Sequence, residues 1–178
     1  MATLPLLASL FDVTGDPSPY SPATRLFWNE FYLDVTRIPE FHTCREAREF
    51  VQSAAAQAEL RALRKEPSVD YRRQLNLQRQ VLTMLSQAFF AGGDPARRED
   101  FERFRREHPQ AEPYARFRAV AERLGPGWQD WPEPLRSGTI GPSDYDESVA
   151  RHHLYAQWQV EDQLRLLAEH AQAKGMLW

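Results

Sequence analysis

The spacing of apolar residues divides the 178-residue chain into a short irregular beginning and a long helical remainder. Residues 71–91 carry apolar side chains three or four positions apart, as on one face of an α-helix. Asp70 is placed to cap this helix, and Gly92 to end it. The same spacing predicts a long final helix, from a cap at Ser143 to about Lys174. Its expected apolar stripe is Val149, His153, Ala156, Val160, Leu164, Leu167 and Ala171.

Shorter helices are expected between these two. Thr43 and Glu46 have the spacing of a capping box, which predicts a helix running towards Lys65. Asp94 and Pro95 predict the start of another helix, because proline is favoured at the first helical position. Most of the chain after residue 42 is therefore expected to be helical.

Two short stretches near the N-terminus favour extended structure instead. Residues 4–8, "LPLLA", form an apolar run, and residues 31–35, "FYLDV", contain residue types that are common in strands. Between them, residues 15–22, "GDPSPYSP", hold three prolines, which fix φ and disfavour helix. We expect an ordered loop here, with the ring of Tyr20 held in place. The predicted fold class is mainly α, with a few short strands.

Composition and charge exclude some functions. The net charge is −3 and the pI is about 6.0, whereas nucleic-acid binding usually needs a clustered basic excess. The first residues lack the basic start of a signal peptide and are too short an apolar run to span a membrane. Cys44 is the single cysteine, which fits a reducing compartment. We expect a cytoplasmic protein in which Cys44 is a small residue in the first turn of a helix.

One metal site is conceivable. His152 and His153 are followed by Glu161 and Asp162 in the same predicted helix. Adjacent helical residues point to different faces, however, unlike a ligand pair at positions i and i+4. We therefore favour one packed and one exposed histidine over a metal site.

Several carboxylates and aromatic residues of the sequence are candidates for binding sugar. Asp70, Asp144, Asp146 and Glu147 are better explained as charges at helix N-termini than as a pair facing each other across a sugar. The aromatic residues are numerous enough for sugar stacking, although packing in the core and loops explains most of them equally well. This set is Tyr20, Trp28, Tyr32, Trp128, Trp131 and Trp178.

Residues 15–35, "GDPSPYSPATRLFWNEFYLDV", resemble the 4-α-glucanotransferases, the amylomaltase or disproportionating-enzyme family. That family carries a "GDSPY" loop followed by an "NP-L-IDL" stretch. The residues that match the two motifs are Gly15, Asp16, Ser18, Pro19, Tyr20, Asn29, Leu33 and Asp34, with Pro17 as a departure. The later order of segments, including "WQDWPEPLR" and "HHLYAQWQ", is also similar, so the resemblance extends over residues 3–178.

The resemblance implies a (β/α)8 barrel with large helical insertions, of which this chain is an incomplete part. Residues 1–42 would hold an early barrel strand and the proline-tyrosine loop of the active site. Residues 43–174 would form a helical insertion subdomain. Residues 175–178 would begin a further barrel strand that is cut short.

The resemblance also implies an activity, which is the transfer of α-1,4-glucan segments between maltooligosaccharides with retention. Tyr20 and Ser18 would contact the glucan. No residue of this chain matches a catalytic carboxylate of the family, so we assign no catalytic residue and expect the chain alone to be inactive. No metal and no organic cofactor is implied. The alternative is a stand-alone helical module that binds glucan or a partner without catalysis.

Overall fold

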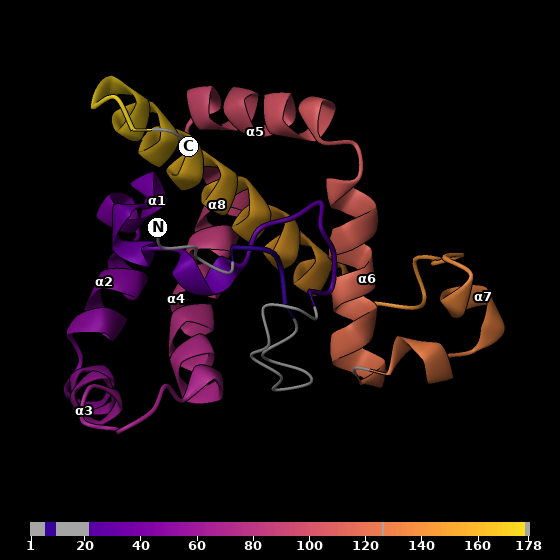
Figure 1. The fold of residues 1–178 in the computed structure, drawn as a ribbon, viewed down its shortest axis with the longest axis horizontal. Coiled ribbons are helices and arrows are strands. Elements are labelled where there is room, and N and C mark those ends of the chain that lie inside the picture. The colour runs from indigo at the N-terminus through magenta and orange to yellow at the C-terminus, as the bar shows by residue number, and fades with distance from the viewer. Residues whose placement is uncertain (1–5, 10–21, 126, 177–178) are drawn as a thin grey trace.

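The computed structural model describes residues 6–9, 22–125 and 127–176, and these residues are mainly helical (Figure 1). The mainly α prediction is therefore confirmed. The α-helices are α1 (Pro39–Thr43), α2 (Arg45–Gln52), α3 (Ala54–Leu63), α4 (Tyr71–Gly92), α5 (Pro95–Glu107), α6 (Ala111–Leu124), α7 (Glu133–Arg136) and α8 (Glu147–Ala173). Three short 3-10 helices are η1 (Glu30–Tyr32), η2 (Val35–Arg37) and η3 (Trp128–Asp130).

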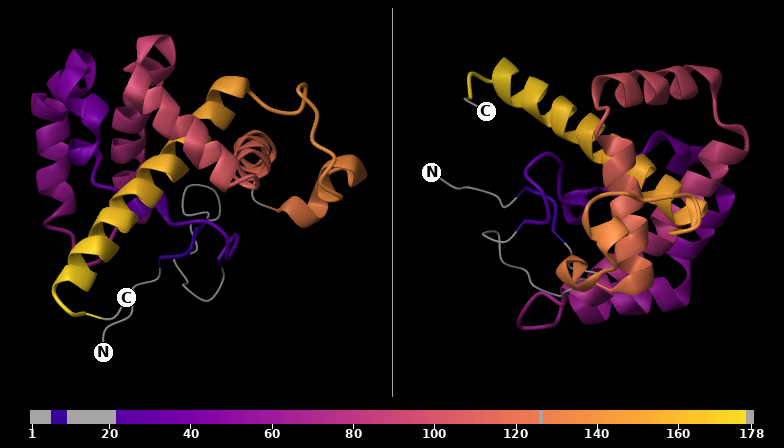
Figure 2. Two further views of the ribbon diagram at one scale, coloured as in Figure 1. Left: turned by 90° about the horizontal axis from the view of Figure 1, so that it is seen from above. Right: turned by 90° about the vertical axis from the view of Figure 1, so that its right-hand side faces the viewer.

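Helix α8 is the central element. It packs against α6 and α4, and η1 also contacts it (Figure 1). Residues 152–160 are all buried, because neighbours cover this part of the helix on every side. The last turns of α8 extend past these neighbours (Figure 2), and Leu166 and Leu167 are exposed. The predicted apolar stripe is thus wrong at Leu167, which no described element covers, although Ala171 one turn later is buried.

The main hydrophobic core joins the N-terminal segment to the helices. Phe27, Leu33 and Ile38 pack in one cluster with Leu85 and Tyr155. Ile38, Leu85 and Tyr155 have no measurable exposure. Each fully buried side chain of this kind stabilises the fold by roughly 1.5–3 kcal/mol. Residues 22–38 therefore belong to the same packed body as α4 and α8.

A second, smaller core lies on the outer side of α6. Val120 and Ala121 of α6 are buried against Trp131, with Leu135 and Ile140 partly buried around them. This cluster attaches α7 and its flanking loops to α6. In both Figure 1 and the left view of Figure 2, α6 separates α7 from α8.

The extended structure expected near the N-terminus is largely absent from the described residues. Residues 31–35 were predicted as a strand, and this is wrong: η1 and η2 form instead. The side chain of Asn29 accepts a hydrogen bond from the Phe31 N–H, and that of Asp34 accepts one from the Thr36 N–H. These local side-chain bonds favour tight turns over extended backbone. Within the described residues the only strand-like pairing is an antiparallel bridge between Leu7 and Trp28.

The predicted helix from Thr43 to Lys65 is wrong in its continuity. The chain forms α1, α2 and α3 instead, with breaks at Cys44 and Ser53. The Thr43 hydroxyl donates back to the Glu40 carbonyl and caps nothing, while the Ser53 hydroxyl accepts from the Ala56 N–H and starts α3. Cys44 is the residue that precedes α2, not a residue of its first turn.

The ends of the two long helices were predicted to within one residue, except the start of α8, which lies three residues later than predicted. Asp70 caps α4 by accepting a hydrogen bond from the Arg73 N–H. Helix α8 is capped by Asp146, which accepts from the Ser148 N–H, so the cap predicted at Ser143 is wrong. No barrel strand forms among the described residues, and the (β/α)8 barrel stays a prediction about a longer protein.

Candidate functional site

The two residues predicted to touch sugar, Tyr20 and Ser18, lie outside the described residues. The structure describes what flanks their segment on both sides. The Ala8 N–H donates to the Phe27 carbonyl at 2.8 Å, and the Ala23 N–H donates to the Ala8 carbonyl at 2.8 Å. The Asn29 N–H donates to the Leu6 carbonyl at 2.7 Å. Residues 6–9 and 22–29 are therefore hydrogen-bonded to each other at the base of segment 10–21.

Asn29 adds a side-chain contact across this base. It is buried, with 4 % exposure, and its amide nitrogen donates to the Ser9 hydroxyl at 3.2 Å. Its amide oxygen accepts from the Phe31 N–H at 3.0 Å. One side chain thus joins the residue before segment 10–21 to the turn that follows it.

Three glutamines hold the backbone that follows the segment. Gln157 of α8 both accepts from the Trp28 N–H and donates to the Trp28 carbonyl, at 3.1 and 2.9 Å. Gln163 makes the same pair of bonds with Asp34, at 3.0 and 2.8 Å. Gln78 of α4 donates to the carbonyls of Glu30 and Leu33. Side-chain amides here bond the backbone as a neighbouring strand would. At Leu33, whose bond to Gln78 is buried, the amide satisfies a carbonyl that would otherwise lack a partner.

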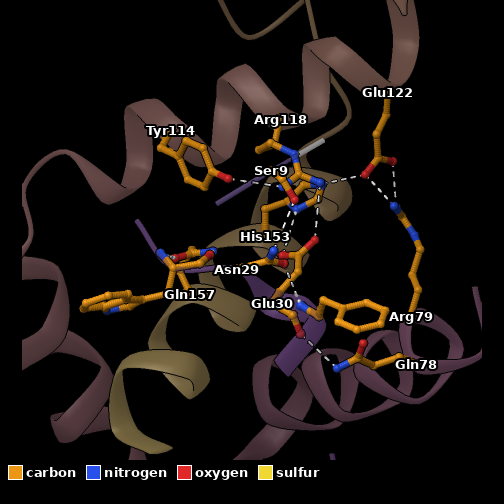
Figure 3. Close-up of polar contacts among 12 residues, drawn as sticks. Ser9, Asn29, Glu30, Gln78, Arg79, Tyr114, Arg118, Glu122, His153 and Gln157 are labelled. Atoms are coloured by element: carbon orange, nitrogen blue, oxygen red, sulfur yellow. Dashed lines mark hydrogen bonds and ion pairs between the residues drawn. The ribbon is translucent and has the colours of Figure 1, made fainter. Parts of the chain in front are cut away.

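Next to these glutamines lies a buried group of charges that we call the His153 cluster: Glu30, Arg79, Arg118, Glu122 and His153 (Figure 3). His153 and the Arg118 side chain are each 1 % exposed. His153 Nε2 lies 2.5 Å from Glu122 Oε1, and its Nδ1 lies 3.8 Å from Glu30 Oε2. The imidazole therefore sits between two carboxylates that come from η1 and α6.

Each carboxylate of the cluster also has an arginine partner. Arg118 Nη2 lies 3.3 Å from Glu30 Oε1, and both terminal nitrogens of Arg79 donate to Glu122 at 2.5 and 2.6 Å. Arg118 also donates to the Tyr114 hydroxyl at 3.1 Å. The cluster thus connects α4, α6 and α8 to Glu30, which lies shortly after segment 10–21.

These contacts keep both carboxylates ionised. Burial alone would raise the pKa of Glu122, but hydrogen bonds with His153 and Arg79 lower it to about 2. Burial would likewise raise the pKa of Glu30, and the charges of Arg118 and His153 bring it far below its usual range. A general acid that cleaves a glycosidic bond needs the opposite shift, a raised carboxyl pKa. The cluster therefore lacks the acid that sugar cleavage requires.

The histidine prediction is wrong for one residue. Both His152 and His153 are buried, at 5 % and 1 % exposure, because they begin the part of α8 that is covered on all sides. Burial lowers the pKa of His152 from 6.5 to about 3, and the neighbouring His153 lowers it further in the same direction. His152 is therefore neutral at physiological pH, with Nδ1 at 3.4 Å from the Thr83 hydroxyl.

The conceivable metal site does not assemble. Within residues 6–9, 22–125 and 127–176, no three His, Cys, Asp or Glu side chains lie close enough together to hold a metal ion. Glu161 accepts a hydrogen bond from the Trp28 indole, and Asp162 pairs with Arg97 and Arg165. Both carboxylates are thus engaged away from the two histidines.

A cavity of about 400 Å³ lies beside the His153 cluster. Its lining includes Glu30, Gln78, Arg79, Glu122 and His152, together with leucines of α4. Sequence reasoning missed this polar group. The one available signal was a polar residue, His153, in a helix stripe expected to be buried.

The aromatic set separates into different environments. Trp131 is buried, Trp28 is half-buried and bonds to Glu161, and Tyr32 and Trp128 are exposed at 41 % and 43 %. Tyr20 and Trp178 lie outside the described residues. Of the tryptophans that the structure describes, Trp128 is the most accessible to a ligand.

A family model and individual known proteins both show a similarity to the same enzyme family. A family model described as 4-alpha-glucanotransferase matches residues 1–177. A 4-alpha-glucanotransferase of Mycobacterium tuberculosis is 30 % identical over 172 residues, which cover 90 % of this chain and 22 % of that protein. One of Haemophilus influenzae is 41 % identical over 54 residues, 30 % of this chain and 8 % of that protein. The chain thus spans about a fifth of the length of its longest-matching relatives.

None of the helices in the described part of the chain is both long enough and apolar enough to cross a bilayer.

Proposed function

Because the chain belongs to the 4-alpha-glucanotransferase family, we propose that it is part of an enzyme that transfers α-1,4-glucan segments between maltooligosaccharides with retention. The observation that carries this proposal is the family match over residues 1–177. The quoted proline-tyrosine segment, residues 15–20, lies within the matched range. The proposed substrate is a maltooligosaccharide or another α-glucan.

Within this enzyme, Tyr20 and Ser18 are proposed to contact the glucan. A tyrosine ring offers an apolar face to a pyranose, and both hydroxyls offer hydrogen bonds. Three prolines in residues 17–22 restrict the backbone, which reduces the entropy lost when substrate binds. The hydrogen bonds between residues 6–9 and 22–29 support the proposal, because they hold together the residues on either side of segment 10–21.

The proposal assigns no catalytic residue to this chain. Retaining transfer needs a carboxylate nucleophile and a second carboxyl group with a raised pKa, about 5–5.5 Å apart. The buried carboxylates of the His153 cluster have lowered pKa values and are committed to arginines. We propose that the groups that break the bond belong to the part of the enzyme outside these residues, and that the chain alone is inactive.

The proposed architecture and setting follow from the same family. Residues 43–174 would form a helical insertion on a (β/α)8 barrel, and residues 1–42 and 175–178 would belong to the barrel and its active-site loop. Neither a metal nor an organic cofactor takes part in the proposed reaction. The single cysteine fits a reducing compartment, so the proposal places the enzyme in the cytoplasm.

The test compares two proteins in the same assay. The 178-residue chain and a protein in which it is continued to the length of its relatives are each incubated with maltotriose. We expect the longer protein to release glucose and form longer oligosaccharides, and the 178-residue chain to do neither. Transfer by the 178-residue chain would show that the catalytic groups are misplaced, and inactivity of the longer protein on all maltooligosaccharides would refute the proposed reaction.

A further inference from the structure

Two tryptophans of one short motif lie in opposite environments. In "WQDWP", Trp131 is 6 % exposed, its indole N–H donates to the Gly125 carbonyl at 3.1 Å, and its ring lies 5.4 Å from that of Phe117. Packing thus explains Trp131 fully. Trp128, three residues earlier in η3, is 43 % exposed, and the core does not explain it.

Trp128 borders a hollow of about 300 Å³ between α6 and α7, which is at the lower end of the range for small-molecule sites. Its walls include Arg116, Phe117, Trp128, Trp131, Leu135 and Arg136. Its lining residues come from α6, η3, α7 and the loop after α7. In Figure 1, α7 lies on the side of α6 opposite to α8. The contact between the Phe117 and Trp131 rings forms part of this wall.

The charges at the hollow are balanced within the protein. Arg116 Nη2 lies 3.5 Å from Glu112 Oε2 one turn earlier, and Arg136 pairs with Glu133 and donates to the Gln129 carbonyl. Each guanidinium is therefore oriented by a carboxylate that also neutralises its charge. A guanidinium carries five N–H donors, so such a site offers hydrogen bonds without attracting anions strongly.

The hollow presents aromatic side chains next to arginine N–H donors whose charge is neutralised by carboxylates. These features suit one class of ligand, an uncharged polyol with an apolar face. A pyranose has this character, since its C–H groups form a face and its hydroxyls lie at the edge. We propose that the Trp128 hollow is a second binding site for an α-1,4-glucan chain. This inference rests on the proposed function for the choice of glucan, and it adds a second place on the protein that holds the polymer. A second contact raises the effective concentration of a long chain at the first.

The proposal is tested by binding of the 178-residue chain to maltodextrin. Binding is measured as the retardation of the protein in a gel that contains the polysaccharide. Trp128→Ala should weaken retardation about tenfold, as expected for loss of an aromatic anchor, and Trp128→Phe should retain most of it. Leu166→Ala is the matched control, because Leu166 is similarly exposed, at 51 %, but lies on α8. It should bind like the unchanged protein.

A second pair of variants tests the polar side. Arg136→Ala should weaken binding, whereas Arg103→Ala should not. The two arginines are 49 % and 54 % exposed, and each pairs with a carboxylate three residues earlier. Circular dichroism of every variant checks that the helices remain.

The ligand is tested with maltohexaose and cellohexaose, which share the same glucose units but differ in linkage. Unchanged binding in Trp128→Ala, absence of binding by the original chain, or equal binding of both hexaoses would each overturn the proposal. Absence of transfer by the unmodified longer protein would instead refute the proposed function. Binding that depends on Trp128 could still be measured in that case, so the two proposals fail separately.

Discussion

Two buried ionic clusters flank α8, and they are built differently. The His153 cluster places an imidazole between Glu30 and Glu122, each with its own arginine. The second, which we call the Tyr155 cluster, consists of Glu40, Arg97, Tyr155, Gln159 and Asp162. It has one central guanidinium, and it joins α1 and α5 to α8.

The Tyr155 cluster is the better satisfied of the two. Glu40 accepts hydrogen bonds from Arg97 and from the Tyr155 hydroxyl, at 2.9–3.3 Å, and the Arg97 guanidinium lies 4.0 Å above the Trp158 ring. Among its described atoms, Gln159 Nε2 is buried without a hydrogen-bond partner. In the His153 cluster the same is true of both Glu30 Oε2 and His153 Nδ1, which lie 3.8 Å apart.

This difference suggests different roles. The Tyr155 cluster contains no histidine, and burial raises the pKa of the Tyr155 hydroxyl, with the nearby Glu40 adding to the rise. It should hold three helices together at any physiological pH. The His153 cluster lies beside His152 and adjoins the base of segment 10–21, so its integrity should matter both for pH-dependent stability and for the glucan contact proposed there.

The largest expected effect comes from breaking the His153 cluster at Arg118. Arg118→Ala removes a fully buried cation and leaves Glu30 without that partner, which should lower the free energy of unfolding by about 3–5 kcal/mol. Arg116→Ala, on the same helix but with a side chain 44 % exposed, should cost no more than about 1 kcal/mol. Denaturant titration measures both, and equal losses would mean that the cluster is not a special source of stability.

The next effect concerns pH and His152. Because burial lowers its pKa from 6.5 to about 3, the unfolded chain binds this proton first as the pH falls. The stability of the folded state is then fully present above pH 6.5 and declines as the pH falls towards 3. Between pH 7 and pH 5 this amounts to about 2 kcal/mol.

His152→Gln should remove this loss between pH 7 and pH 5. His170→Gln, which changes an exposed histidine of the same helix, should leave it intact. Chemical denaturation at pH 7, 6 and 5 gives the slope for each protein. The window lies above pH 4.5, so Glu122, whose pKa is about 2 when folded and 4.5 when unfolded, adds little to the slope. An unchanged slope in His152→Gln would show that His152 is not the group responsible.

A smaller effect is expected in the Tyr155 cluster. Tyr155→Phe removes one hydrogen bond to the Glu40 carboxylate and leaves the ring in place, which should cost about 1.5 kcal/mol. The loss should be the same at pH 7 and pH 5, in contrast to that of His152. Tyr32→Phe is the control, because Tyr32 is 41 % exposed. A Tyr155→Phe loss that varies with pH would remove the distinction between the clusters.

Local signals in the sequence were sufficient where neighbouring residues decide the structure. Asp70 and the apolar spacing after it predicted α4 to within one residue, and Asp94 with Pro95 predicted the start of α5. The mainly α class followed from these signals. Failures occurred where two local signals competed, as at residues 31–35, where the Asn29 and Asp34 side chains favoured turns over a strand.

The candidate site was less predictable, because its contacts are distant in the sequence. Gln157 and Trp28 are 129 residues apart, and Glu30 and Arg118 are 88 apart. Periodicity assigns each of these residues to a helix face or a loop but does not show that they meet. The burial of both His152 and His153 could not be predicted either, since it depends on α4, α6 and η1 all packing against α8.

The most direct test measures kcat/KM for maltotriose in a Tyr20 variant of a protein with the full length of its relatives. Tyr20→Ala should lower kcat/KM for maltotriose about tenfold, which corresponds to about 1.4 kcal/mol of transition-state binding. Tyr32→Ala, an exposed tyrosine close in sequence, should change it less than about twofold. If Tyr20→Ala leaves kcat/KM unchanged, the glucan does not depend on this ring, and the central claim is wrong.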